Sequence, residues 1–216
     1  MKIQQFIKKL NNTELGKGNT HEYYVLVPSN LDIEVIFDEQ NRNPLFFDKV
    51  SNKNRQNLAQ LTVGRESRIK GLGPYYREND LCAGDEIVFE RRDYEGRTEF
   101  YVDLNVKQNI ITFQKNSKGF EVLNLDRLTS KIKDNKYYIK AYYKNKLCDV
   151  LIEFKEAFKK RADSPVTTDF YDIIVDSNSI LSEFKGNEYL ELEEMPNQTN
   201  LKKVVVWQNY EFQLQE

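Results

Sequence analysis

The sequence predicts a mainly β protein with short helices, built from two successive parts. Tyr and Phe each occur 13 times among the 216 residues, and aromatic side chains favour strands. Short runs of alternating apolar and polar residues recur along the chain, and turns rich in Gly, Asn, Asp or Pro separate them. A hydrophobic content of 39% is enough for a sizeable core, which argues against a disordered chain.

The first part is expected to contain strands and one helical turn. Residues 21–28, HEYYVLVP, form a strong strand pattern that ends at a proline. Segments 100–104 and 109–113 are expected to pair as a hairpin. The remaining expected elements are a strand or helix start over 3–10, strands over 33–37, 58–63 and 68–70, a helical turn over 75–80, and a strand that follows the Gly-Asp turn at 84–85.

A polar run at 114–119 marks the expected boundary, which gives a first domain over 1–115 and a second over 116–216. The second domain is expected to be a β-rich (α+β) accessory domain, and its role is left open. A lysine-rich amphipathic helix is expected over 154–161. Strands are expected over 137–143, 147–154, 171–175, 189–192 and 203–207.

Composition excludes several classes of protein. Only two cysteines (Cys82 and Cys148) and one histidine (His21) are present, too few for a structural zinc site or a disulfide framework. Most zinc hydrolases and Ser-His-Asp hydrolases are excluded for the same reason. No apolar stretch approaches the roughly 18 residues that a membrane span needs. We therefore expect a reduced, cytoplasmic protein that needs no metal or other cofactor for binding.

The net charge of −2 gives no sign of a nucleic-acid partner, but the local distribution of charge does. Residues 49–77 contain seven basic residues and one acid, Glu66, whereas residues 78–103 contain nine acids and three arginines. Residues 2–17 add four lysines against one acid. The pattern is compatible with two basic arms that converge on phosphates, or with solvated loops whose charges cluster by chance.

Three stretches in this order resemble the B3-like DNA-binding pseudobarrel. This fold occurs in plant transcription factors and in the effector or target-recognition domains of EcoRII-, BfiI- and NgoAVII-type restriction endonucleases. The stretches are residues 7–28, with a Thr/Gly-rich loop between two strands; 65–71, RESRIKG; and 75–89, YYRENDLCAGDEIVF. The third is the most specific. Leu72 stands where the plant pattern places Trp, which favours the bacterial branch.

The resemblance implies sequence-specific binding of double-stranded DNA by two arms that enter the major groove, as the recognition part of a restriction-modification system. Asparagine and arginine can read adenine and guanine, while a carboxylate can accept from cytosine. A plain turn and a surface ion pair are the alternatives for the two arms. The implied N-arm residues are Thr13, Lys17, Asn19, Thr20 and His21; the C-arm residues are Arg65, Glu66, Ser67, Arg68 and Lys70; and the phosphate contacts are Lys49, Lys53, Arg55 and Arg77.

The second part offers two weak catalytic candidates. A PD-(D/E)xK nuclease holds Mg²⁺ with an Asp and a Glu-x-Lys triplet on a neighbouring strand. Such triplets occur at Glu153–Lys155 and Glu183–Lys185, the latter after Asp172 and Asp176. About two are expected by chance in this length, so catalysis is not assigned. A small Mg²⁺-dependent restriction endonuclease and a protein-interaction barrel that binds no DNA remain alternatives. A nuclease domain or subunit, or a second copy of the chain, would be further partners.

Overall fold

The computed structural model describes residues 1–17, 21–37, 40–124, 135–159 and 167–214. Strands account for 55% of the described residues and helices for 6%, so the expected mainly β fold class is confirmed. Contacts divide the chain into unit 1, Met1–Lys107 with Val206–Glu216, and unit 2, Gln108–Val205. None of the described helices has the length and apolar character that a membrane crossing needs.

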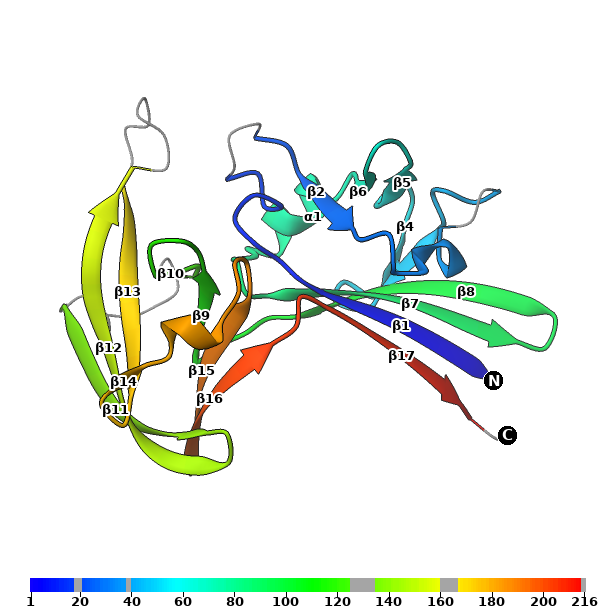
Figure 1. Ribbon diagram of the computed structural model, residues 1–216. Coiled ribbons are helices and arrows are strands. Elements are labelled where there is room, and N and C mark those ends of the chain that lie inside the picture. Colours follow the sequence, from blue (N-terminus) through cyan, green and yellow to red (C-terminus); the bar gives the residue numbers. More distant parts are fainter. Residues whose placement is uncertain (18–20, 38–39, 125–134, 160–166, 215–216) are drawn as a thin grey trace. The chain divides into compact units, whose positions relative to one another are not determined.

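Unit 1 is built on a six-stranded sheet with the order β17-β1-β7-β8-β3-β4. Strand β1 lies between β17 and β7 and is antiparallel to both, as Figure 1 shows for the blue, red and green strands. Strand β3 joins β8 in the parallel direction. The strands of this sheet are β1 (Lys2–Lys9), β3 (Phe46–Asp48), β4 (Lys53–Arg55), β7 (Glu86–Tyr94), β8 (Arg97–Asn105) and β17 (Trp207–Gln213).

A second, three-stranded sheet of unit 1 carries both predicted arms. Its order is β2-β6-β5, and all of its pairings are antiparallel. The strands are β2 (Tyr24–Val27), β5 (Gln60–Thr62) and β6 (Ser67–Lys70); the 3-10 helix η1 (Ile33–Val35) follows β2, and the α-helix α1 (Gly73–Glu78) follows β6.

Aromatic rings fill the core of unit 1. The rings of Phe37, Phe46 and Phe89 are almost fully buried, and their centroids lie 5.6–5.9 Å apart. Val25 and Ile69, on the inner face of the three-stranded sheet, are also fully buried. Fully burying one such side chain contributes roughly 1.5–3 kcal/mol, so the inner faces of both sheets hold the unit together.

Unit 2 is a closed seven-stranded barrel. The strand order is β10-β9-β15-β16-β11-β12-β13, and an additional pairing of β10 with β13 closes the ring. The short strand β14 pairs with β13 outside that ring. The elements are β9 (Ile110–Lys115), β10 (Phe120–Val122), β11 (Lys136–Tyr143), β12 (Lys146–Phe158), β13 (Thr168–Val175), β14 (Asn178–Ser179), the 3-10 helix η3 (Leu181–Glu183), β15 (Tyr189–Met195) and β16 (Gln198–Val204).

Alternation along the strands decides what fills this barrel. In β12, Cys148, Val150 and Ile152 are buried, whereas Leu147 and Asp149, which alternate with them, are exposed. Strand side chains point to opposite faces in turn, so one face of each strand lines the interior and the other meets solvent. Both cysteines of the chain are buried, Cys148 here and Cys82 in unit 1.

Three expected local elements are wrong. The amphipathic helix over 154–161 is not formed, because Phe154–Phe158 continues β12 and pairs with β13; residues 160–161 lie outside the described residues. The strand expected over 33–37 is the 3-10 helix η1. Segment 100–104 does not pair with 109–113, because the turn at Gly96 (φ +80°) folds β8 back onto β7.

The division into units falls at 107/108 rather than at the expected 115/116. Strand β9 crosses the expected boundary and belongs wholly to the barrel, because it pairs with β15 and β10. The chain then returns to unit 1 after residue 205, where β17 pairs with β1.

Candidate nucleic-acid interface

The base of the N-arm rests on a buried ion pair. Nζ of Lys8 lies 2.8 Å from Oε2 of Glu14, and only 2% and 4% of these side chains are exposed. The same carboxylate accepts a hydrogen bond from the backbone N–H of Asn11, and the amine also donates to the carbonyl of Lys9. Buried charges occur almost only as pairs, so this contact fixes where the arm leaves β1.

The far end of the arm is closed by Tyr23. An antiparallel bridge pairs Tyr23 with Leu15, so these two residues lie side by side. The Tyr23 ring lies against two glycines, because a Cβ would be 2.7 Å from the ring at Gly16 and 2.9 Å at Gly73. Gly16 has φ +74°, which glycine adopts at little cost. The guanidinium of Arg77, on α1, lies 5.2 Å from the same ring.

Between these two supports, Thr13 and Lys17 are exposed, and so is His21. His21 has φ +52°, a left-handed conformation that is uncommon outside glycine. Two predicted N-arm residues, Asn19 and Thr20, lie outside the described residues.

The C-arm is the exposed turn between β5 and β6. Ile69 of β6 points into the core, so Arg68 and Lys70 project from the outer face of the three-stranded sheet. A hydrogen bond from the Thr62 hydroxyl to the carbonyl of Arg68 joins the two strands near the turn. Arg65 and Glu66 lie in the turn itself and are exposed.

Arg68 is held from three sides. Its Nη2 donates to Oε2 of Glu66 at 2.8 Å, and its Nη1 lies 3.8 Å from Oε2 of Glu22. The guanidinium also lies 4.4 Å from the centre of the Tyr24 ring, a cation–π distance. The hydrogen bond that Arg68 donates to Glu66 raises the pKa of Arg68 above its usual value. The arginine is therefore permanently charged, partly exposed and restricted in orientation.

Two predicted phosphate contacts instead neutralise buried carboxylates. Nζ of Lys49 lies 3.0 Å from Glu90, whose side chain is 2% exposed. Nε of Arg55 lies 3.1 Å from Asp48, which is fully buried. Both acids need these cations, because an unpaired buried charge is strongly destabilising. Lys53 and Arg77, the other two predicted contacts, are exposed.

The structure thus brings the two predicted arms together only in part. Arg68 of the C-arm reaches Glu22 and Tyr24, which follow the N-arm directly. Lys49 lies instead beside Glu90 of β7 and the Tyr101 ring of β8, in the six-stranded sheet. Sequence reasoning missed the roles of Glu22 and Tyr24, because their contact with Arg68 depends on the pairing of β2 with β6.

In unit 2, the glutamate of each nuclease triplet is paired with a lysine outside its triplet. Glu153 lies directly opposite Asp172 on the neighbouring strand, but its carboxylate is 2.6 Å from Nζ of Lys136. Glu183 lies in η3 and accepts from Lys144 and from the hydroxyl of Tyr143, which lowers the pKa of Glu183. Lys155 and Lys185 are both exposed. Within the described ranges, no group of three or more His, Cys, Asp or Glu side chains is arranged to hold a metal ion.

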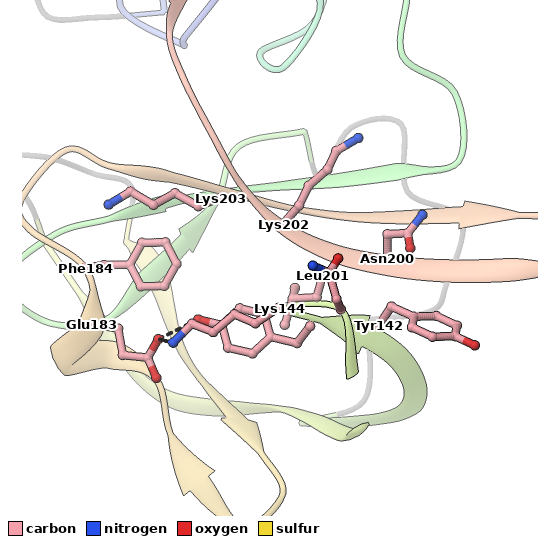
Figure 2. Close-up of a pocket in the computed structure, with 10 residues that line it drawn as sticks. Tyr142, Lys144, Glu183, Phe184, Asn200, Leu201, Lys202 and Lys203 are labelled. Carbon is pink, nitrogen blue, oxygen red and sulfur yellow. Dashed lines mark hydrogen bonds and ion pairs between the residues drawn. The ribbon is translucent and has the colours of Figure 1, made fainter. Parts of the chain in front are cut away.

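Unit 2 also contains an open hollow of about 650 Å³ beyond the end of β11, shown in Figure 2. Phe184, Tyr143 and Leu201 form its apolar floor, since all three are nearly buried. Three lysines lie around it, and each is already paired with a glutamate: Lys144 with Glu183, Lys202 with Glu193 and Lys203 with Glu188, at 2.5–2.6 Å. An anion would have to displace these carboxylates, so the lysines do not define an anion site.

Comparison of the chain with protein-family models, with curated proteins and with solved structures found no match.

Proposed function

We propose that this chain binds double-stranded DNA sequence-specifically through unit 1, as the recognition part of a restriction-modification system. The observation that carries the proposal is the placement of Arg68. This residue projects from the outer face of the three-stranded sheet, with its guanidinium fixed between Glu66 and the Tyr24 ring. The resemblance of residues 1–115 to the B3-like pseudobarrel supplies the assignment of the two arms and the restriction context.

A fixed guanidinium suits base readout better than phosphate binding. Guanine presents N7 and O6 in the major groove, and an arginine fork contacts both. Holding the side chain in place before binding lowers the entropy lost when the fork engages the base. A contact that only neutralises phosphates has no need of a neighbouring carboxylate, which repels the DNA backbone. Glu66 therefore acts by orienting Arg68 or by accepting from cytosine N4.

In this proposal the N-arm makes a second set of contacts with the DNA, beside those of the C-arm. Lys8 and Glu14 fix its base, and the Tyr23 ring fixes its end. Thr13 and Lys17 lie between these supports and face solvent, where hydroxyl, amine and backbone N–H groups can contact phosphates.

Exposed cations of unit 1 supply binding that does not depend on sequence. These residues are Lys17, Lys53, Arg65, Lys70 and Arg77. Lys49 and Arg55 contribute to the fold instead, because each neutralises a buried acid. With Z phosphates neutralised, log K falls against log salt with a slope of about −0.9Z, and the five cations lead us to expect Z of roughly 4–5.

The test is selection of a preferred duplex from a random library, followed by gel shifts of three variants. Arg68→Ala is expected to weaken the selected duplex on the order of 10- to 100-fold and random duplex little, because a bidentate base contact is lost. Lys53→Ala, the matched control, is expected to weaken both duplexes alike and to reduce the salt slope by about one. Glu66→Ala is expected to strengthen random binding and to weaken the selected site.

Two results would contradict the proposal at different levels. Binding to no duplex, or binding that does not change with salt, removes the DNA function. A Glu66→Ala protein that binds both duplexes more tightly shows that Glu66 neither contacts a cytosine nor orients Arg68. In that case Arg65 and Arg68 form a phosphate clamp without specificity.

A further inference from the structure

We propose that two copies of this chain associate through the outer edge of β17, which pairs antiparallel with its own copy around a two-fold axis. The outer edge of β17 is open to a further strand. Strand β17 ends the six-stranded sheet and pairs with β1 on one side only among the described strands.

The backbone shows which residues face this edge. The N–H of Leu214 donates to the carbonyl of Met1, and the N–H of Lys9 donates to that of Val206. Hydrogen-bonded pairs alternate along an antiparallel ladder, so the even-numbered residues of β17 bond to β1. Trp207, Asn209, Glu211 and Gln213 consequently direct their backbone N–H and C=O groups away from the sheet, over a length of about 23 Å.

The two edges of the same sheet differ in their protection. At the other edge, β4 has three residues, two of which are Lys53 and Arg55. Short strands and cations are the usual protection against edge pairing. Strand β17 has seven residues, WQNYEFQ, without Lys, Arg, Pro or Gly. Its single charge, on Glu211, is matched by Lys2 at 3.0 Å.

The exposed aromatic side chains of β17 indicate that this edge is covered by a partner. Tyr210 and Phe212 are 44% and 45% exposed, and their rings stack with centroids 6.2 Å apart. Leu214, just beyond the strand, is 50% exposed. A row of apolar side chains beside unpaired backbone groups is the surface on which another strand adds most readily.

A second copy fits this edge in one register that uses its full length. With the two-fold axis at Tyr210, Asn209 lies opposite Glu211 of the other copy, and Trp207 lies opposite Gln213. These two kinds of pair occur twice each and exchange about eight backbone hydrogen bonds. No like charges face each other, and the Asn209 amide can donate to the opposite carboxylate. The sequence of β17 is therefore complementary to itself, which is what an isologous interface requires.

The proposed dimer does not depend on DNA binding, because it follows from the edge and side chains of β17 alone. Its consequence for recognition rests on the proposed function: two copies of the arms related by a two-fold axis would read a palindromic or nearly palindromic site.

Two cysteine variants of the full chain test the register directly. In a non-hydrogen-bonded pair the Cα atoms lie about 4.5 Å apart, within disulfide range. Tyr210→Cys is therefore expected to form a covalent dimer under mild oxidation, visible on a non-reducing gel. Phe212→Cys, the matched control, should not, because in this register each Phe212 faces Gln208 of the other copy. Preferential cross-linking of Phe212→Cys, or equal cross-linking of both variants, would overturn the register.

Analytical ultracentrifugation without DNA tests the association itself. The wild-type chain is expected to sediment at twice 25.6 kDa. Tyr210→Lys should sediment as a monomer, because two ammonium groups would meet at the axis. Tyr138→Lys changes a 69% exposed tyrosine of unit 2 and should remain dimeric. A wild-type monomer that also fails to cross-link through Tyr210→Cys would refute the dimer and leave the DNA proposal untouched.

Discussion

Replacing Glu14 by Gln tests whether the buried pair with Lys8 holds the base of the N-arm. The pair lies at 2.8 Å with both side chains almost fully buried. Removing one partner of such a pair leaves the other charge uncompensated and costs about 3–5 kcal/mol. For a unit of this size each kcal/mol corresponds to roughly 4 °C in Tm. Thermal unfolding followed by circular dichroism should therefore show a Tm lower by about 10–20 °C.

The pH dependence of this variant has a definite sign. Burial lowers the pKa of Lys8 below the ordinary 10.5, against the opposing effect of Glu14. Without the carboxylate this pKa falls further. Between the folded and unfolded pKa values the unfolded chain binds more protons, so stability rises with pH. The deficit of Glu14→Gln is expected to be largest at neutral pH and to shrink as the pH approaches 10.5.

Two controls separate this pair from ordinary surface charge. Lys8→Met combined with Glu14→Gln removes both charges and should be more stable than Glu14→Gln alone. Asp149→Asn breaks an exposed pair with Lys140 at 2.8 Å and should leave Tm almost unchanged. A Glu14→Gln protein that melts with the wild type, with a parallel pH profile, would refute the reasoning.

The remaining predictions concern catalysis, acid stability and the arm. Incubation with the selected duplex and Mg²⁺ should leave both strands intact on a denaturing gel; cleavage that Glu153→Ala or Glu183→Ala abolishes would assign nuclease activity to unit 2. Although burial alone would raise it, hydrogen bonds lower the pKa of Asp48 below 3.8, so its stabilisation is complete above that pH and is lost as the pH falls through the lowered value. Urea unfolding at decreasing pH should show this loss, and Asp48→Asn should make it smaller. Gly16→Ala should destabilise more than Gly96→Ala in the same urea assay, because both have positive φ but only the former meets a ring, at 2.7 Å; equal losses would show that the ring moves aside.

The fold class could be predicted because it depends on local alternation. Strand β11 illustrates this, since Tyr137, Ile139 and Ala141 point inward while the residues between them are exposed. Strand β12 shows the limit. Its last residues have the composition of an amphipathic helix, yet Phe158 pairs with Thr168 of β13, and long-range pairing overrides local propensity. The pairing of Ile3 with Phe212 joins opposite ends of the chain and has no local signal.

In the candidate site, as in the fold, local contacts could be predicted from the sequence and contacts between distant strands could not. The contact between Glu66 and Arg68 is local, because the residues lie two positions apart, and an orienting role for the acid could be suggested from the sequence. The stacking of Arg68 on Tyr24 could not, because it depends on the register that places Leu26 opposite Arg68. The assignment of Lys49 to the buried Glu90 likewise depends on pairing between distant strands.

The return of β17 to β1 also sets an order of events during synthesis. The barrel is made from one uninterrupted segment, Gln108–Val205, so it can close as soon as that segment leaves the ribosome. Unit 1 cannot be completed then, because β1 waits for a strand that is translated after the barrel segment. Until that strand arrives, one side of β1 in the nascent chain is open to incorrect pairing, which is the stage at which chaperones would act.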